Sequence, residues 1–307
     1  MSLTFERAAR RPAVFRRLTS LSVPEFTILV EKLRPEWERR ERERRAARPR
    51  RNAVGQGHPY AGSFATMVLL VVVYLRTPSG NAIISWLFGI NEVTVRAWRR
   101  RIVPLLTDRF IPSTPVRGKQ RRINDLDEFL EAYPEVKELI ADGTEFKTER
   151  PKRRQAKNYT GKSKRHVKKT IVVVNRADGL FLGRTRVRPG SVHDKRVLEE
   201  DPMHRRLDRK PSLTKRTDSA WTGEDPTNGW IVNKRGRRNH PLTDAERRAN
   251  RKLSKIRIRV EHAIRRLKVF RRFAGTVVIR SPGAFAASLD ACMNLANFTM
   301  LVRKQIA

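Results

Sequence analysis

Hydrophobic and polar positions change their spacing about one third of the way along the chain. Up to about residue 110, apolar residues recur at helical intervals between basic turns. The longest apolar run, TMVLLVVVYL at 66–75, is about half of the roughly 20 residues that span a bilayer, so it predicts a buried helix. The stretch at 38–57 has almost no apolar residues and predicts a solvated helix end followed by a mobile linker. We therefore expect an all-helical domain over residues 1–110.

Residues 77–106 predict two helices joined by a tight turn. A short helix over Ala82–Phe88 is followed by the turn Gly89–Asn91, and Asn91 is placed to cap a longer second helix. Two helices joined by a three-residue turn that contains glycine form a helix-turn-helix, which we place at about 81–106.

The second of these helices has two different faces. One face is apolar and consists of Val95, Trp98, Ile102 and Leu106. The other carries Val93, Arg96, Ala97 and Arg100. A recognition helix needs this arrangement, because Arg96 and Arg100 would offer guanidinium groups to a major groove. The alternative is a bundle helix with a solvated basic face.

The pattern changes again after a segment at 111–124 that is rich in proline, glycine and basic residues and predicts a hinge. A short helix at 126–133 is followed by apolar segments that predict strands at 136–148, 168–179, 180–191 and 213–221. The turn at 177–179 predicts a hairpin. Helices are expected at about 243–272 and 283–303. We therefore predict an α/β domain over 125–307, with a mixed sheet flanked by helices.

The excess of basic residues indicates which class of molecule the protein binds. The 307 residues include 68 Lys and Arg against 31 Asp and Glu, a net charge of +37. Charged residues make up 32% of the chain, which excludes a membrane protein. Nucleic acid is the predicted partner, and an anionic membrane surface is the weaker alternative. The lone Cys292 excludes an intramolecular disulfide and a thiolate zinc site, and no export signal is evident at the N-terminus, so we expect an intracellular protein.

Three acidic residues stand out in so basic a chain. Asp142 follows an apolar run within DGTE, Asp218 ends the fourth predicted strand within RTDSAW, and Glu261 lies in the long helix. A mixed sheet can bring the first and fourth strands together, and a helix across it can add a third carboxylate. Such a trio would bind Mg²⁺. Two ions about 3.5–4 Å apart would activate the attacking oxygen and stabilise the leaving oxygen of a phosphodiester.

The long helix supports a role for Glu261. At 100° per residue, Arg257, Glu261 and Lys268 fall within about 40° of one another, and an apolar stripe lies roughly a quarter turn away. The helix can pack its apolar stripe on the sheet. The flank of the helix then turns Glu261, together with Arg257 and Lys268, toward a cleft. The alternative is an ordinary i, i+4 ion pair.

Asp194 competes with Asp218 as the second catalytic carboxylate, because both follow strands. We prefer Asp218, since Asp194 would more naturally cap the next helix or hold His193 as a supporting group.

Other residues predict contacts with DNA. Trp221 would stack on an unpaired base or, as the alternative, lie in the core. The basic hairpin would grip phosphates through Lys162, Arg165 and His166, and nearby cysteines that would favour zinc are missing from the sequence around His166. Arg257 and Lys268 would contact the scissile strand or orient Glu261, and a role limited to a salt bridge stays open.

The acidic residues belong to a series of motifs. DGTE lies at 142–145, a basic hairpin at 159–169, SVHD at 191–194, DSAW at 218–221, and an R-x3-E-x6-K pattern at Arg257, Glu261 and Lys268. In order and spacing these motifs resemble the DDE transposases, specifically the bacterial insertion-sequence group related to PIF/Harbinger elements. The resemblance covers about 125–270 and extends to the helix-turn-helix. The sequence departs from the family's pattern at two places. Ala220-Trp221 replaces the family's Gly-Tyr after the second aspartate, and Ser254 replaces the tyrosine expected three residues before Arg257.

The resemblance implies an RNase H-like core in which Asp142, Asp218 and Glu261 ligate two Mg²⁺ ions, with Mn²⁺ as a possible substitute. An activated water would cut the transposon end, and the freed 3′-hydroxyl would attack target DNA. Partners would be double-stranded DNA and further copies of the chain, as a homodimer or larger assembly, with no small-molecule substrate. The expected location is the bacterial cytoplasm, at the nucleoid. Alternatives are a domesticated, non-catalytic DNA-binding protein and an RNase H-like nuclease.

Overall fold

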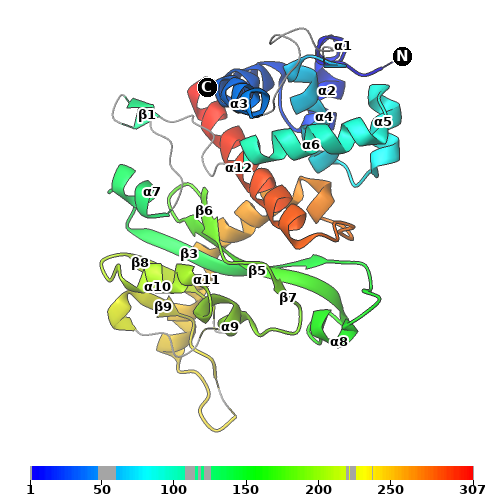
Figure 1. Cartoon of the computed structure of the whole chain (residues 1–307). Helices are drawn as coiled ribbons and strands as arrows, with labels where there is room; N and C mark the ends of the chain where they lie inside the picture. Colours follow the sequence, from blue (N-terminus) through cyan, green and yellow to red (C-terminus); the bar gives the residue numbers. More distant parts are fainter. Residues whose placement is uncertain are drawn as a thin grey trace. The chain divides into compact units, whose positions relative to one another are not determined.

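The computed structural model describes residues 2–47, 60–107, 115–116, 119–120, 126–218, 221, 226–236 and 238–306. The chain forms two compact units (Figure 1). We call Met1–Arg122, Val269–Arg272 and Ala287–Ala307 the helical unit, and Ile123–Lys268 with Phe273–Ala286 the sheet unit. Two short pieces predicted to belong to the second domain are therefore grouped with the N-terminal helices. The predicted hinge at 111–124 lies outside the described residues, apart from the paired strands β1 (Pro115–Val116) and β2 (Lys119–Gln120).

The helical unit is built around one buried helix. Its elements are α1 (Phe5–Ala9), α2 (Pro12–Thr19), α3 (Val23–Ala46), α4 (Phe64–Arg76), α5 (Asn81–Phe88), α6 (Glu92–Leu106) and the C-terminal part of α12 (Pro282–Ile306). All residues of α4 from Thr66 to Leu75 are buried, as the apolar run predicted. Each of these side chains leaves water as the helices pack around α4, and this burial is the main favourable contribution to folding of the unit.

The end of α3 is less exposed than predicted. The helix continues through the charged sequence to Ala46, and the side chain of Glu41 within it is buried. Arg44 and the hydroxyl of Tyr60 both donate hydrogen bonds to the Glu41 carboxylate, which satisfies its buried oxygens. The prediction of a wholly solvated helix end is therefore wrong at Glu41. The expected linker at 48–59 lies outside the described residues.

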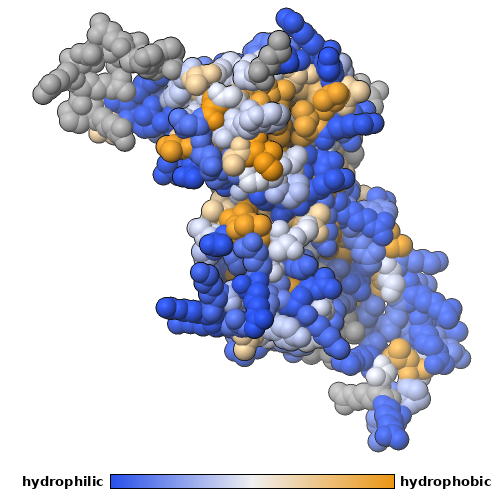
Figure 2. All heavy atoms as spheres, turned by 90° about the vertical axis from the view of Figure 1, so that its right-hand side faces the viewer, coloured by the Kyte–Doolittle hydropathy of each residue, from blue (hydrophilic) through white to orange (hydrophobic). Residues whose placement is uncertain are grey.

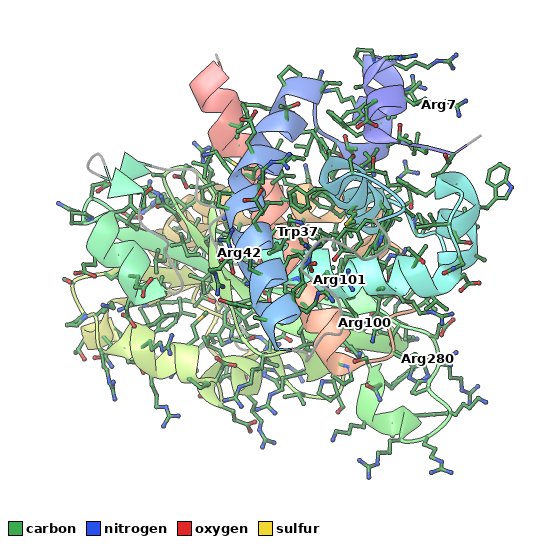
Figure 3. The ribbon with its side chains drawn as sticks, turned by 45° about the horizontal axis from the view of Figure 1, so that its top comes forward. Arg7, Trp37, Arg42, Arg100, Arg101 and Arg280 are labelled. Carbon is green, nitrogen blue, oxygen red and sulfur yellow. The ribbon has the colours of Figure 1, made fainter. Side chains whose placement is uncertain are left out.

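The two predicted helices around Gly89 are present. Gly89 has a φ of +64°, and the Asn91 side chain accepts a hydrogen bond of 2.7 Å from the backbone N–H of Thr94 at the start of α6. The predicted apolar stripe of α6 is buried throughout, at Val95, Trp98, Ile102 and Leu106. Arg96 and Arg100 are exposed, and Figure 3 shows the neighbouring Arg100 and Arg101 on this helix. Arg101 instead donates a hydrogen bond of 2.8 Å to Tyr60.

Arg272 connects residues 269–272 to the other helices of the helical unit. The guanidinium carbons of Arg99 and Arg272 lie 3.6 and 3.8 Å from the ring centroid of Tyr74 on α4. Arg272 is buried and donates hydrogen bonds to the backbone oxygens of Tyr74 and Ser79. These bonds and the cation–π contact compensate for burial of the charge.

The sheet unit contains a mixed sheet centred on β3 (Glu138–Lys147). Along one edge of β3 runs β5 (Arg165–Asn175), antiparallel, and along the other runs β8 (Thr214–Thr217), parallel. A further parallel strand, β9 (Trp230–Val232), pairs with β8 and was not predicted. Strand β5 also pairs with β4 (Tyr159–Thr160), β6 (Phe181–Arg184) and β7 (Arg188–Pro189). The predicted hairpin between β5 and β6 is confirmed, and Gly179 in its turn has a φ of +72°.

Helices flank this sheet, so the predicted mixed α/β architecture is confirmed and is compatible with an RNase H-like fold (Figure 1). They are α7 (Leu126–Ala132), α8 (Gln155–Asn158), α9 (Asp194–Glu199), α10 (Pro202–Asp208) and α11 (Asp244–Lys268). On β3 the buried Phe146 meets Phe273 and Phe285 edge to face, with ring centroids 5.4 and 5.8 Å away. This aromatic cluster is part of the core on that side of the sheet.

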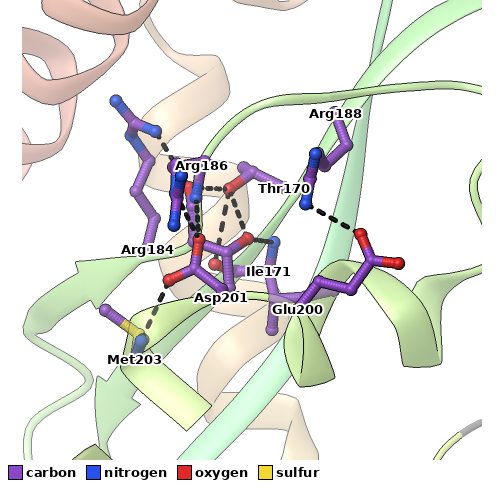
Figure 4. Close-up of polar contacts among 9 residues, drawn as sticks. Thr170, Ile171, Arg184, Arg186, Arg188, Glu200, Asp201 and Met203 are labelled. Carbon is purple, nitrogen blue, oxygen red and sulfur yellow. Dashed lines mark hydrogen bonds and ion pairs between the residues drawn. The ribbon is translucent and has the colours of Figure 1, made fainter. Parts of the chain in front are cut away.

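The segment between β6 and β7 is fastened by Asp201, which lies between α9 and α10 (Figure 4). Its carboxylate accepts hydrogen bonds from the backbone N–H groups of Arg186, at 2.7 Å, and Met203, at 3.0 Å. One buried carboxylate therefore both caps α10 and positions the segment after β6.

Helix α12 is long and apolar enough to cross a membrane by length and composition, but 67% of its most apolar window is buried inside the protein. That burial is typical of a core helix. On the face seen in Figure 2, hydrophilic residues cover most of the sheet unit, as the high charge requires.

A buried lysine on β8 predicts how stability depends on pH. Lys215 is 1% exposed, and its ammonium donates hydrogen bonds of 2.5 Å to the backbone oxygens of Lys210 and Asn228. Burial lowers its pKa to about 8. Between this value and the ordinary pKa of about 10.4, the unfolded chain binds more protons than the folded one. The free energy of unfolding should therefore rise with pH across this window, by up to roughly 3 kcal/mol.

Urea unfolding at pH 7.5 and at pH 10 measures this rise. In the Lys215→Met variant the part of the rise that comes from Lys215 should disappear, because the titrating group is gone. Lys147→Met, at an exposed position on β3, is the matched control and should retain the full rise. An equal rise in both variants would contradict the assignment to Lys215.

Candidate active site

Two of the predicted carboxylates lie side by side. In the parallel pairing of β3 with β8, Glu138 is opposite Thr214 and Ile140 is opposite Arg216. Continuing this register by two residues places Asp142 opposite Asp218. The expected adjacency of the first and fourth predicted strands is therefore confirmed, and it is what brings these two aspartates to one edge of the site.

Arg257 on α11 contacts both aspartates. Its Nη2 lies 3.2 Å from Oδ2 of Asp142 and 3.9 Å from Oδ2 of Asp218. The other oxygen of Asp142, Oδ1, accepts a hydrogen bond of 2.8 Å from the backbone N–H of Gly143. Three elements, β3, β8 and α11, thus position one cation and two carboxylates. The structure places Arg257 on the aspartates, and these ion pairs match the salt-bridge role that was left open beside a contact with DNA or with Glu261.

The site concentrates negative charge in a partly buried place. The side chains of Asp142 and Asp218 are 15% and 32% exposed. Burial raises the pKa of Asp142, and the nearby charge of Asp218 raises it further, whereas Arg257 and the Gly143 N–H act in the opposite direction. Two carboxylates held together need a cation between them, and hard carboxylate oxygens are the ligands that Mg²⁺ and Mn²⁺ prefer.

Glu261 does not join the aspartates in this arrangement. It lies one turn after Arg257 on α11, and its side chain is exposed. Leu253, Val260, Ala263 and Leu267 form the buried side of this helix, and Arg257 lies at its margin. The helical step from residue 257 to 261 turns Glu261 by about 40° further from that side. Among the described residues no group of three or more His, Cys, Asp or Glu side chains is placed to hold a metal.

Asp194 belongs to a different cluster, on the other face of β3. Its carboxylate is 2.9 Å from the ammonium of Lys169, and Glu145 is 3.6 Å from the same group. A side chain at Gly143 would point at Asp194, within 3.5 Å of its Oδ2. Because successive residues of a strand face opposite sides, Asp142 faces away from this cluster. This placement supports the choice of Asp218 over Asp194.

The expected role of Asp194 as a helix cap needs correction. The cap of α9 is His193, whose Nδ1 accepts a hydrogen bond of 3.3 Å from the backbone N–H of Lys195. Asp194 lies one residue inside the helix and bonds to Lys169 instead of holding His193. Lys169 and Glu145 were not among our candidates, although both lie within the motifs quoted above.

The remaining candidates are divided between surface and core. Lys162, Arg165 and Lys268 are exposed, as a contact with DNA requires. His166 is only partly exposed, and its Nδ1 is buried. Trp221 is 1% exposed and lies in the core, where it cannot stack on a base as placed, so its burial agrees with the alternative we stated.

Comparison with known proteins agrees with this geometry. Residues 141–297, about half of the chain, match the family model for DDE superfamily endonucleases. The chain belongs to this family. This endonuclease is also 28% identical, over 213 residues, to the probable transposase for insertion sequence element IS702 of Microchaete diplosiphon, covering 66% of our chain and 69% of that protein. No solved structure matches.

The family assignment bears on the metal. DDE superfamily endonucleases depend on divalent metal ions. In this endonuclease Asp142 and Asp218 fit such an ion in the chemistry of their donors and in their convergence on one cationic group, the Arg257 guanidinium. Of the three predicted ligands, Asp142 and Asp218 lie together and Glu261 does not join them.

Proposed function

We propose that this endonuclease is a DNA transposase that binds the terminal inverted repeats of its element, cuts the ends, and joins the freed 3′-hydroxyl to target DNA. The observation that carries the proposal is the approach of Asp142 and Asp218, from adjacent parallel strands, to one atom of Arg257 inside the region that matches the DDE endonucleases. Asp142, Asp218 and, as third ligand, Glu261 would hold the divalent metal, two Mg²⁺ in our proposal with Mn²⁺ as a substitute. When bound, the metal activates the attacking oxygen and stabilises the leaving oxygen.

The protein's own groups would bring the DNA to these carboxylates. The exposed cations Lys162, Arg165 and Lys268 are suited to phosphate contacts, and His166 follows Arg165 on β5. Such contacts fix the position of the duplex without reading its sequence. Because two ends must be joined, we propose a homodimer or larger assembly on DNA. We also propose the relation to PIF/Harbinger elements and a location at the nucleoid.

Helices α5 and α6, acting as a helix-turn-helix, would recognise the DNA sequence of the element's ends. The exposed face of α6 presents Val93, which is 65% exposed, together with Arg96 and Arg100. An apolar side chain can contact a thymine methyl group, and arginine can contact guanine.

The Arg96→Ala, Arg100→Ala double variant should weaken binding to the element's ends by at least about 30-fold, because each of the two base contacts contributes about 1–3 kcal/mol and about 1.4 kcal/mol corresponds to a factor of ten. Binding to random duplex of equal length should change much less. Fluorescence anisotropy on both duplexes at one salt concentration measures the ratio. Arg42→Ala, at an exposed position on α3, is the control and should leave the ratio unchanged. Equal losses on both duplexes would contradict sequence reading by α6.

The proposed function as a whole is tested by incubating the purified protein with linear DNA that carries the element's ends, with Mg²⁺ or with EDTA. We expect cutting at the ends and joined products only with Mg²⁺. Cutting without end preference would indicate a plain RNase H-like nuclease. End binding without any cutting would indicate a domesticated DNA-binding protein.

A further inference from the structure

The guanidinium of Arg257 occupies the place where a metal would be expected. One atom, Nη2, approaches carboxylate oxygens of both Asp142 and Asp218, at 3.2 and 3.9 Å. The Arg257 side chain is 19% exposed, so this contact is partly shielded from water. The cation that holds the two aspartates together is therefore part of the protein.

The geometry of the contact between Arg257 and the two aspartates suits a guanidinium that can exchange one anionic partner for another. Both approaches use Nη2, and the Nε of Arg257 is buried without a hydrogen-bond partner. By contrast, Arg44 on α3 donates hydrogen bonds from its Nε and Nη2 to the two oxygens of Glu41, at 3.1 and 2.8 Å. A guanidinium that presents two N–H groups to one carboxylate is held in a fixed orientation, whereas the arrangement of Arg257 leaves its orientation less constrained.

Because both are positively charged, the guanidinium and a divalent ion would compete for the carboxylates of Asp142 and Asp218. The two carboxylates carry two negative charges, and Arg257 neutralises one of them. A divalent ion on the same oxygens would neutralise both, and it would lie within a few ångströms of the guanidinium, where like charges repel strongly in a partly buried site. Arg257 and the metal would therefore exclude each other from the two aspartates. When the guanidinium moves away from the aspartates, its positive charge needs another anion as a partner. A phosphate of the bound DNA is such an anion, and arginine binds phosphate well.

We propose that Arg257 is a tethered cation that competes with the divalent metal for Asp142 and Asp218 and yields to it when a DNA phosphate takes the guanidinium. This inference rests on the proposed function for the identity of the metal-binding carboxylates. Its consequence is a coupling between two ligands: DNA raises the affinity of the site for metal, and the metal raises the affinity for DNA by the same factor. In the free protein Arg257 thus neutralises one of the two negative charges, and the reactive metal is acquired where DNA is present.

The experiment measures Mn²⁺ binding by the full-length protein from the electron paramagnetic resonance signal of free Mn²⁺. Titrations are made without DNA and with a duplex carrying an element end, at a pH and temperature at which no cutting occurs within the measurement. Asp142→Ala with the same duplex is the blank for Mn²⁺ that binds to DNA itself.

Without DNA, Arg257→Gln should bind Mn²⁺ at least about tenfold more tightly than the wild type, because a unit positive charge next to the ion is removed. Adding the duplex should tighten Mn²⁺ binding by the wild type by a similar factor and that by the variant very little. Arg259→Gln removes the same charge at an exposed position two residues further along α11, and it should behave as the wild type. Arg257→Lys keeps the charge and should not tighten binding.

Two results would overturn the proposal. One is Mn²⁺ affinity in folded Arg257→Gln that is equal to or weaker than that of the wild type. The other needs no variant and stands even if Arg257→Gln fails to fold: equal Mn²⁺ affinity of the wild type with and without the duplex. If the wild type cuts DNA but shows neither effect, the inference fails and the proposed function stands. If both effects are present and no DNA is cut, the inference stands and the proposed function fails.

Discussion

Asp142→Ala and Asp218→Ala are each expected to slow metal-dependent cleavage of the element's ends by at least about a thousandfold. The reason is that each variant removes a carboxylate from the pair that β3 and β8 place side by side, and metal stabilisation of the transition state contributes several kcal/mol. Each 1.36 kcal/mol corresponds to a factor of ten in rate. Single-turnover cleavage of end-labelled duplex with excess protein measures the chemical step directly. Glu261→Ala should show a comparable loss if Glu261 completes the site.

Asp194→Ala is the internal control for this series. Asp194 is on the opposite face of β3 and bonds to Lys169, so its loss should reduce cleavage far less than loss of Asp218. A smaller effect through stability is expected, because Lys169 is 8% exposed and would keep only the longer contact with Glu145. Full loss of cleavage in Asp194→Ala with Asp218→Ala unaffected would reverse the assignment. Circular dichroism of each variant separates loss of chemistry from loss of fold.

The sequence predicted those parts of the fold that depend on local periodicity. The apolar run of α4 and the apolar stripe of α6 are both buried as expected, because helical spacing alone decides which side chains share a face. The adjacency of β3 and β8 needed one further step, namely that a mixed sheet can bring the first and fourth predicted strands side by side. That step was sufficient to bring Asp142 and Asp218 together. The expectation that Asp142 lies at a strand end is wrong, because β3 continues from Asp142 to Lys147.

Features that depend on register or on long-range packing could not be predicted in the same way. The cluster of Lys169 with Glu145 exists because these residues are directly opposite each other on β5 and β3, and only the pairing register decides this. The burial of Trp221 and the contact of Arg257 with both aspartates depend on how loops and α11 pack against the sheet. Similarly, the helical spacing of α12 does not indicate that its C-terminal part packs with the N-terminal helices.

Motif spacing alone did not predict the position of Glu261 relative to the two aspartates. Sequence spacing places Arg257, Glu261 and Lys268 on one stripe of α11, and this holds in the structure as a statement about the helix. The rotation of the helix about its own axis, however, is set by its buried residues. That rotation directs Arg257 to the aspartates and leaves Glu261 exposed, so the membership of Glu261 in the metal site stays a prediction.

Phe146→Ala is expected to destabilise the protein by about 3–5 kcal/mol, the largest effect on stability that we predict from a single substitution. Phe146 is fully buried on β3 and meets both Phe273 and Phe285 edge to face, so truncation leaves a cavity and removes two aromatic contacts. Urea unfolding followed by circular dichroism measures the loss. Lys147→Ala, at the next and exposed position of the same strand, is the control and should change stability by less than about 0.5 kcal/mol.

The same variant tests how far the site depends on the core beneath it. Phe146 and Asp142 are four residues apart on β3 and therefore face the same side of the sheet. If the aromatic cluster only keeps the strand folded, cleavage by Phe146→Ala should fall in proportion to the folded fraction, and the rate per folded molecule should equal that of the wild type. If the cluster also fixes the position of Asp142, the rate per folded molecule should fall as well. Because the parallel pairing of β3 with β8 extends to Ile140, two residues before Asp142, we expect the first result.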